Sequence, residues 1–405
     1  MKASEIFIAA LLLCPAGCIL PDYGLNSGPL RSDCFKRGQD GASGPGEGPG
    51  AGPEAPAFDT TLYFCAVRFS DSYDWQRDTA YGSEDYELLL YRDFEPVLCI
   101  NSRAAQCISP DFDTHHIIDG QLYTERSDLS STAIGRNGDE IIRFSGRELL
   151  KGLLPAGDDI YTLSQSRDGN GFSFRKNGEP LLIRSEGSVF GSMDDPSYGP
   201  TGALYLDGGV PVFCYRSGSG SSREYFCVRD GIEEKLYPAT TASGQEAVND
   251  MKIRDGTPYI SDIQGGIWHT VSCRLWFLPS DILIAGYIRN ASSYFTGTYS
   301  TLTRSHGWLC EEEATVYCSD GASYAVASGD DGRVTVYRGD EIMHTNSGCI
   351  FLSPACAALA GSELVYALAG GEDDGYPIIC EGEKETAVEV NGYISRVAVE
   401  ISPAS

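Results

Sequence analysis

Residues 159–183 read DIYTLSQSRDGNGFSFRKNGEPLLI and contain every part of a unit that recurs along the chain. An alternating segment that carries Tyr161 is followed by a Gly- and Asp-rich bend and by a second alternating segment ending at Phe174-Arg175. Asn177-Gly178 then supplies the positive φ angles that a tight hairpin turn needs. The stretch therefore predicts strand, bend, strand, hairpin turn and strand, and not a binding or catalytic loop.

The same order of parts occurs elsewhere in the chain. "RNGD" at 136–139 and "RDGI" at 229–232 match the hairpin turn, and the wide interval before residue 324 leaves room for a degenerate unit at 281–297. A lone hairpin is only marginally stable, so units of this length must stack on one another. A Gly or Asp stands three residues before a Tyr at Tyr123, Tyr161, Tyr205, Tyr259 and Tyr324, with a looser version at Tyr366.

Units of 40–50 residues with four strands each are typical of β-propeller blades. The last stretch is an alternating strand with no partner after it, NGYISRVAVEIS at 391–402. The strands nearest the N-terminus are too few to form a complete blade. Pairing these ends would remove an open sheet edge. We therefore predict an all-β protein, a β-propeller of seven or eight four-stranded blades closed by its N- and C-terminal strands. Residues 146–157 alone have helical character, limited to a turn or two by Pro155 and Gly157.

The N-terminus predicts export. The apolar run in MKASEIFIAALLLCPAGC is about half the ~20 residues that a membrane-spanning helix needs, which indicates a signal peptide at 1–18. The small residues before Cys18 resemble a bacterial lipoprotein signal, in which that Cys becomes the lipidated first residue; Pro15 and Glu5 depart from the pattern, and an ordinary cleaved signal is the alternative. Residues 19–57 are Gly/Pro-rich and are expected to be a disordered tether to a propeller domain at 58–405.

The net charge and the positions of the cysteines argue against a nucleic-acid-binding protein and against a zinc or redox protein. A formal net charge of −27 repels nucleic acid and anionic membranes. Most of the 14 cysteines lie in strand-like apolar runs and none forms a CxxC pair, which favours buried thiols over a zinc or redox motif. Cys214 with Cys227, and Cys310 with Cys318, are the pairs that neighbouring strands would bring together.

The layout of a Tyr strand followed by an Asn-Gly turn resembles the "YvaG…WkNG" repeat of exported bacterial propeller proteins, many of them lipoproteins of the Bacteroidetes type. The resemblance covers about 113–390, and the Trp before the turn is replaced here by Phe174, Val228 or Tyr337. It implies an outer-membrane lipoprotein of the cell envelope and no defined activity.

No motif identifies an active site. Acidic loops at 157–159, 167–171, 193–196, 329–332 and 371–375 offer oxygen ligands, but none has the spacing of a calcium loop, and we predict no metal and no cofactor. Residues 328–332 resemble the Asp-box of sialidases, which is a structural turn in that family. His115 and His116 are adjacent, so on a strand they point to opposite faces and cannot share a metal.

Aromatic residues between 190 and 310 suggest a binding surface. Trp268, Trp308 and Tyr294 lie beside irregular loops, where they could stack on sugar rings, with blade core as the alternative. We expect non-enzymatic binding of an envelope or extracellular protein or glycan by a monomer that contacts the membrane only through its lipid. The alternatives are a carbohydrate-active enzyme, sialidase-like or another glycosidase, with an acidic and Arg-lined central channel, and a purely structural envelope component.

Overall fold

The computed structural model describes most of the chain after residue 57, and the predicted signal peptide, Cys18 and the predicted tether lie outside the described residues. Within the described ranges, no helix is long and apolar enough to cross a membrane. The described ranges are 58–75, 86–101, 114–128, 130–167, 170–218, 223–236, 247–263, 270–290, 293–303, 305–329, 332–370 and 375–403.

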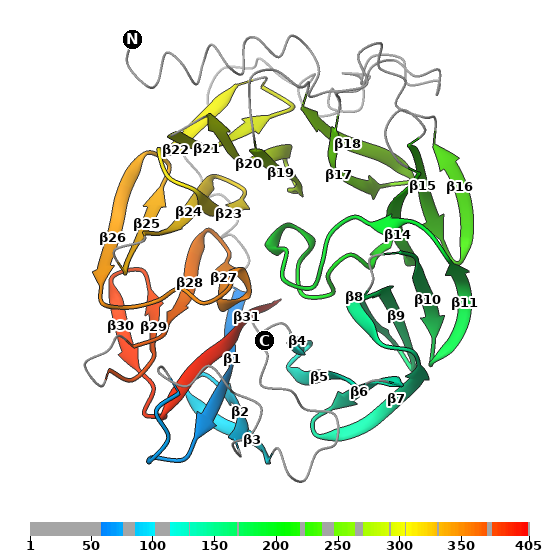
Figure 1. Ribbon diagram of the computed structural model, residues 1–405. Helices are drawn as coiled ribbons and strands as arrows, with labels where there is room; N and C mark the ends of the chain where they lie inside the picture. Colours follow the sequence, from blue (N-terminus) through cyan, green and yellow to red (C-terminus); the bar gives the residue numbers. More distant parts are fainter. Residues whose placement is uncertain are drawn as a thin grey trace, which may run out of the picture.

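The strands form eight antiparallel sheets that follow one another around a common centre (Figure 1). The first sheet has the order β3-β2-β1-β31, with β1 (Phe58–Phe69), β2 (Tyr86–Arg92), β3 (Glu95–Asn101) and β31 (Gly392–Pro403). The second and third sheets contain β4 (His115–Ile118), β5 (Gln121–Ser127), β6 (Ser131–Arg136), β7 (Asp139–Ser145), β8 (Glu148–Ala156), β9 (Asp159–Ser166), β10 (Phe172–Lys176) and β11 (Glu179–Arg184).

The fourth sheet contains β12 (Ser188–Val189), β13 (Tyr205–Asp207), β14 (Val210–Ser217), β15 (Glu224–Arg229) and β16 (Ile232–Leu236), and the fifth contains β17 (Ala247–Arg254) and β18 (Thr257–Ile263). The sixth contains β19 (Thr270–Phe277), β20 (Ile282–Asn290), β21 (Ser293–Ser300) and β22 (His306–Cys310). The seventh and eighth contain β23 (Ala314–Ser319), β24 (Ala322–Ser328), β25 (Arg333–Arg338), β26 (Glu341–Ser347), β27 (Ala357–Ala360), β28 (Glu363–Leu368), β29 (Ile378–Glu381) and β30 (Lys384–Ala387).

This arrangement is a β-propeller, as predicted. Seven sheets are full blades of four or five strands, and the fifth sheet has two strands among the described residues. The degenerate unit expected around 281–297 is present, because β20 and β21 are the middle strands of the sixth sheet. The segment at 146–157 forms β8 and not a helical turn, since its backbone pairs along the length of β9.

The ring closes as predicted. β31 pairs with β1 from Phe58↔Pro403 to Arg68↔Gly392, with one register shift after Cys65. The last strand is thereby the innermost of the first sheet, and the three strands nearest the N-terminus complete that blade on its outer side (Figure 1). Neither β1 nor β31 presents a bare edge along this shared border, which is the benefit of full closure.

A single device explains how the outer hairpins form. Asn177 has φ 52° and Gly178 has φ 85°, as the two central residues of a tight turn require. The Asn177 side-chain oxygen accepts a hydrogen bond from the backbone N–H of Ile160 at 2.8 Å, which ties this turn to the start of β9. Matching bonds join Leu122 to Asn137 at 3.0 Å and Leu62 to Asp93 at 2.9 Å.

These bonds also show which residues occupy equivalent positions in successive sheets, and one position predicted from the sequence is wrong. The residue after each tied position is a buried Tyr at 63, 123 and 161. The turn residue also donates its backbone N–H to the same partner, as Asn177 does to the Ile160 carbonyl oxygen. In the fourth sheet the matching bond runs from the Asp230 N–H to the Pro211 carbonyl oxygen, so Val212 occupies the position of these tyrosines. Tyr205 lies on β13 instead, so its predicted place in the repeat is wrong.

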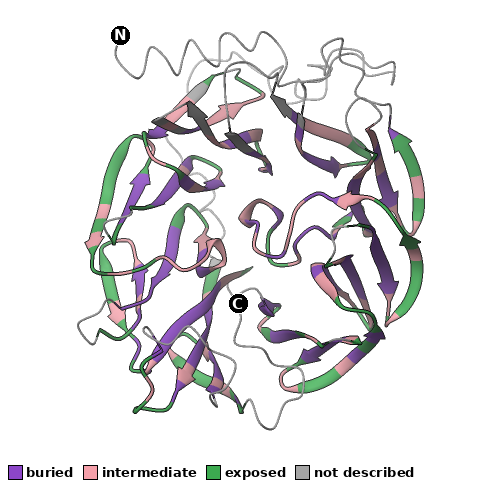
Figure 2. Cartoon of the chain, viewed as in Figure 1, coloured by how far each residue is buried: buried purple, intermediate pink, exposed green. Residues whose placement is uncertain are grey.

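The core lies between the sheets, and the outermost strands are largely exposed (Figure 2). All ten described cysteines are free thiols and eight of them are buried, in agreement with the sequence-based preference. Cys214 and Cys227 face each other across β14 and β15 and are both free. Burial raises the pKa of Cys227 to about 11 and that of Cys318 to about 12, so these thiols stay protonated at neutral pH.

Candidate functional site

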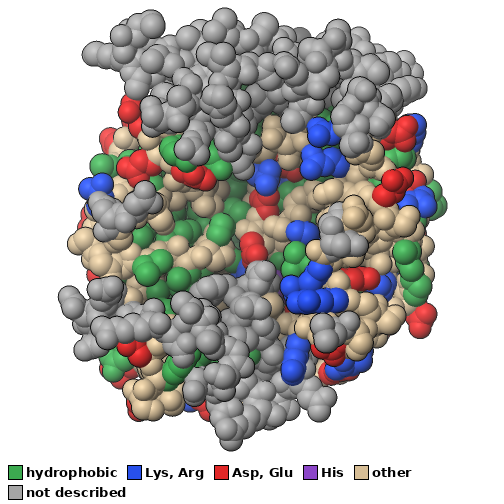
Figure 3. Space-filling model, in the orientation of Figure 1, with side chains coloured by type: hydrophobic (Ala, Val, Ile, Leu, Met, Phe, Trp, Pro, Cys, Tyr) green, Lys and Arg blue, Asp and Glu red, His purple; other side chains and the backbone are tan. Residues whose placement is uncertain are grey.

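The innermost strands converge on a cavity of about 270 Å³ at the centre of the propeller. Its wall combines apolar and charged side chains, which gather in and beside the hollow in Figure 3. A second cavity of about 280 Å³ adjoins it and shares part of its wall, including Trp276. The residues that matter for the chemistry of the first cavity are His116, Asp194, Asp195, Trp276, Tyr317 and Arg396.

One long connection, residues 190–204 between β12 and β13, enters the centre of the ring and is called the central loop here (Figure 1). Its tip is the 3-10 helix η3 (Pro196–Tyr198), which Asp195 caps by accepting a hydrogen bond from the Ser197 N–H at 3.1 Å. Gly191 is required by packing, because a Cβ there would lie 2.6 Å from the Tyr198 ring. The sequence thus shapes this loop locally and does not leave it as a loose insertion.

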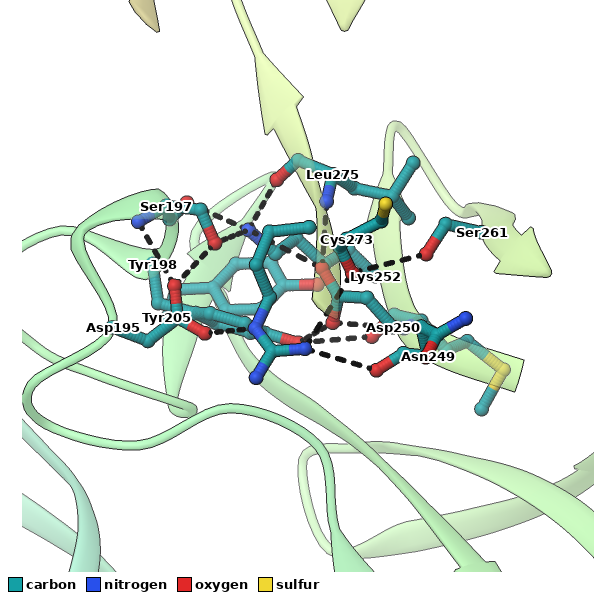
Figure 4. Close-up of polar contacts among 12 residues, drawn as sticks. Asp195, Ser197, Tyr198, Tyr205, Asn249, Asp250, Lys252, Ser261, Cys273 and Leu275 are labelled. Atoms are coloured by element: carbon teal, nitrogen blue, oxygen red, sulfur yellow. Dashed lines mark hydrogen bonds and ion pairs between the residues drawn. The ribbon is translucent and has the colours of Figure 1, made fainter. Parts of the chain in front are cut away.

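A buried polar network holds the central loop against the fifth and sixth sheets (Figure 4). The Tyr198 hydroxyl donates to Asp250, and the backbone N–H of Leu275 donates to the other carboxylate oxygen at 2.8 Å. Lys252 Nζ donates to the carbonyl oxygens of Ser197 at 2.6 Å and Leu275 at 2.5 Å. These bonds connect three separate segments at one point.

The network contains an ion pair that is removed from solvent. Asp250 and Lys252 are 1% and 3% exposed, with 3.9 Å between Asp250 Oδ2 and Lys252 Nζ. Burial raises the pKa of Asp250 and lowers the pKa of Lys252, while each charge opposes the shift of the other. The ammonium also lies 3.7 Å from the centroid of the Tyr198 ring. We assign this group a structural role, since it fixes the central loop.

Two consecutive carboxylates of the central loop reach opposite sides of the ring. Asp195 Oδ2 lies 2.5 Å from Arg274 Nε on β19, and Asp194 forms an ion pair with Arg396 on β31. Arg396 also donates to the backbone carbonyl of His115. The charges that face the cavity are therefore balanced in pairs, and neither aspartate is a free acid or base.

His116 on β4 differs from these paired groups. It is 2% exposed, it lines the cavity, and its Nε2 has no hydrogen-bond partner within the part of the chain that the structure describes. Burial, Arg396 and His115 together hold its pKa well below the usual value, so the ring is neutral at pH 7. A buried polar nitrogen without a partner is costly, so His116 stands out from the paired groups around it.

Tyr294 and Trp308, two of the aromatic residues predicted from the sequence, are not among the described residues that line this cavity. Tyr294 lies on β21, with its ring centroid 5.8 Å from that of Tyr287, and Trp308 lies on β22 opposite Gly297. Strand alternation places Tyr294 and Trp308 on opposite faces of the sixth sheet, so the two do not form one platform. Trp268 lies outside the described residues. A binding role for these three residues stays a prediction.

Some of the central residues had a signal in the sequence and others did not. The sequence draws attention to the acidic loop at 193–196, as a source of oxygen ligands for a cation, and to His115 and His116, as neighbours that cannot share a metal. Asp250 and Lys252 alternate with Met251 and Ile253 along β17, a pattern that predicts a solvent-facing pair and gives no signal of their burial. Arg396 had no signal, because only closure of the ring brings it to the centre.

No family model matches this chain, and no curated protein does. Among solved structures, Hsv2p of Kluyveromyces lactis is 10% identical, covers 78% of this chain and 91% of its own, and has a TM-score of 0.37. The Dos1 propeller is 11% identical, with coverage of 77% and 83% and a TM-score of 0.37. An oligogalacturonate lyase in complex with manganese is 11% identical, with coverage of 82% and 97% and a TM-score of 0.36. Values this low carry no argument about activity.

Proposed function

We propose that this protein is an exported binding module of the bacterial cell envelope, held there by a lipid on Cys18, and that its central cavity receives one end of a glycan. The observation that carries the proposal is a central cavity whose wall brings His116, Arg396 and Asp194 together with aromatic side chains. A neutral imidazole, a guanidinium and a carboxylate can together donate to and accept from sugar hydroxyl groups.

The shape of the cavity supports a small saccharide. Trp276 and Tyr317 form part of the wall, and aromatic rings pack well against the apolar face of a sugar ring. A volume of about 270 Å³ lies just below the roughly 300–1,000 Å³ of pockets for drug-sized ligands. The site is therefore suited to the terminal ring of a chain, and the adjoining cavity offers room for the next one.

Binding is better supported than catalysis. A glycosidase of the common type needs one carboxylic acid and one free carboxylate beside the bond that breaks. Asp194 and Asp195 are both committed to arginines, and Asp250 is enclosed by the Tyr198 and Leu275 bonds. A carbohydrate-active enzyme remains the second candidate, because acidic and Arg side chains do face the channel, and it is tested in the same experiment.

The experiment is a glycan-array screen run beside a glycosidase screen on the purified protein and two matched variants. Trp276→Phe trims a cavity wall, while Trp308→Phe makes the same change on β22, an outer strand of the same sheet. We expect binding without turnover by the wild type and by Trp308→Phe, and at least tenfold weaker binding by Trp276→Phe. His116→Leu, which keeps a similar volume without a polar atom, should lose binding as well.

Each other outcome has a defined meaning. Loss of binding in Trp308→Phe alone would move the site to the aromatic residues of the sixth sheet. Turnover would replace the binding module with an enzyme. Silence on the array, followed by capture of an envelope protein, would replace the glycan with a protein partner.

A further inference from the structure

A second cluster of chemically versatile side chains lies far from the centre, on outer strands of the seventh and eighth sheets. His344 is on β26, Cys380 on β29 and Glu385 on β30. One ring nitrogen of His344, the sulfur of Cys380 and a carboxylate oxygen of Glu385 all lie within 4.8 Å of one another. These are three different donor atoms, from two sheets, at a separation that one ion can span.

The register of the eighth sheet produces this arrangement. Tyr366 on β28 is paired with Cys380, and Cys380 is paired with Glu385, so the three residues form a row across neighbouring strands. Residues directly opposite each other in a sheet share a face. His344 approaches this row from the neighbouring sheet, with its Nε2 3.0 Å from Glu385 Oε1.

Tyr366 orients the imidazole. Its hydroxyl lies 2.6 Å from His344 Nδ1 and engages that nitrogen, while Nε2 faces Glu385. Metal-binding histidines are normally fixed in this way by a partner on the other ring nitrogen. Tyr366 is itself 3% exposed, so the group that sets the ring orientation is rigidly packed.

We propose that His344, Cys380 and Glu385 bind a divalent transition metal, with Zn²⁺ as the best match. Thiolate, imidazole and carboxylate are the ligands that Zn²⁺ takes, and a thiolate disfavours Ca²⁺ and Mg²⁺. Tetrahedral coordination would place the three donor atoms about 3.4–3.6 Å from one another, a small adjustment of the present arrangement, in which they all lie within 4.8 Å. Binding displaces the thiol proton of Cys380 to solvent.

The fourth coordination position faces outward. The side chain of Glu385 is 44% exposed and that of His344 is 22% exposed, whereas Cys380 is fully buried. Water can therefore complete the coordination from the open side. The consequence is a clip between two blades, because His344 belongs to one sheet and the other two ligands to the next. The site is independent of the central cavity and of the function proposed for it.

The sequence predicted no metal because the three ligands have no recognisable spacing. His344 and Cys380 are separated by a whole inner hairpin, and the chain has no paired-Cys motif. Only the stacking of the two sheets brings them together.

The test is titration of the metal-free, untagged protein with Co²⁺, which reports a thiolate ligand through its charge-transfer absorption. We expect one equivalent of Co²⁺ to produce this band and Zn²⁺ to abolish it. Cys380→Ser should lose the band. Cys318→Ser is the matched change at a buried thiol in the neighbouring seventh sheet, and it should keep the band. Zn²⁺ should also raise the melting temperature of the wild type and of Cys318→Ser, but not that of Cys380→Ser.

Glu385→Gln is the second variant, chosen because its exposed side chain leaves the core intact. It should weaken Co²⁺ binding at least tenfold while the thiolate band persists at saturation. Absence of the band in the wild type, or its persistence in Cys380→Ser, would overturn the proposal.

Discussion

Asp207 on β13 holds the turn at Gly256 with its carboxylate. Its oxygens accept hydrogen bonds from the backbone N–H groups of Asp255 at 2.6 Å and Gly256 at 2.9 Å, and they also pair with Arg229. One side chain of the fourth sheet thus grips the hairpin that joins β17 to β18. The fifth sheet has only two described strands, and this contact helps to fix it in the ring.

The grip should be sensitive to acid. Burial opposes ionisation of Asp207, but Arg229 and the two N–H groups outweigh it and leave its pKa lowered. Because the folded value lies below the unfolded value of about 3.9, the contribution is present above that pH and is lost as the pH falls through the folded value. We expect Asp207→Asn to cost about 1–2 kcal/mol at neutral pH and less in acid, measured by urea unfolding. Asp340→Asn, at an exposed turn, is the control, and a constant difference at all pH values would contradict this account.

Breaking the buried ion pair of Asp250 and Lys252 should lower the free energy of unfolding by more than Asp207→Asn does. Lys252→Met leaves Asp250 without its counter-ion, and breaking a buried ion pair costs about 3–5 kcal/mol. The same substitution at Lys235, whose pair with Glu224 is about half exposed, should cost at most ~1 kcal/mol. Chemical denaturation of both variants measures the difference. Equal losses would mean that the Asp250–Lys252 pair does not fix the loop.

The hairpin turns provide a local test. Asn177→Ala removes the side-chain bond to Ile160 and places a residue with poor tolerance for positive φ at 52°, so it should cost about 1–2 kcal/mol. Asn177→Asp keeps an acceptor oxygen for Ile160, as Asp93 does for Leu62 in the first sheet, and should lose less than Asn177→Ala even though it gives up the Nδ2 donation to Asp159 at 2.9 Å. Thermal unfolding compares the two. If both variants were equally destabilised, the side-chain bond would not be the relevant interaction.

Thiol reactivity should follow exposure. Among the ten described cysteines, Cys99 on β3 is the exposed one, whereas Cys65 and Cys356 are buried and their pKa values are raised by burial to about 12. We expect iodoacetamide to modify Cys99 first in the native protein and the buried thiols only after unfolding, with mass spectrometry of peptides as the measurement. Equally fast modification of Cys65 would show that the first sheet opens readily.

The proposed lipid has a direct test in a bacterial host. Metabolic labelling with a fatty-acid analogue should mark the wild type and Cys14→Ala, and should fail with Cys18→Ala, because of the two N-terminal cysteines only Cys18 follows two small residues. Labelling that survives in Cys18→Ala would leave an ordinary cleaved signal as the better explanation.

Local chemistry accounts for what the sequence could predict. The turn at Asn177-Gly178 depends on two adjacent residues, and the alternation of β31 on twelve consecutive ones. The strands, the turns and the closure of the ring could therefore be predicted from the sequence. The phase error at Tyr205 arose because the bond that sets the phase joins Asp230 to Pro211 across the sheet. A Gly followed by a Tyr three residues later is too short a pattern to reveal that pairing.

The site was less predictable because it is assembled from distant segments. His116, Asp194, Trp276 and Arg396 come from four parts of the chain, and their proximity exists only in the closed ring. The aromatic cluster proposed from the sequence rested on closeness along the chain. Alternation along β21 and β22 then directs Tyr294 and Trp308 to opposite faces.

Closure by β31 also sets an order of assembly. Synthesis reaches Arg396 after every other segment that lines the central cavity, and pairing with β1 requires contact across more than three hundred residues of chain. Until then Asp194 lacks its counter-ion and the ring has an open seam. A polypeptide without this strand would lack Arg396 in the cavity wall, so the ligand site proposed above would be incomplete until the chain is finished.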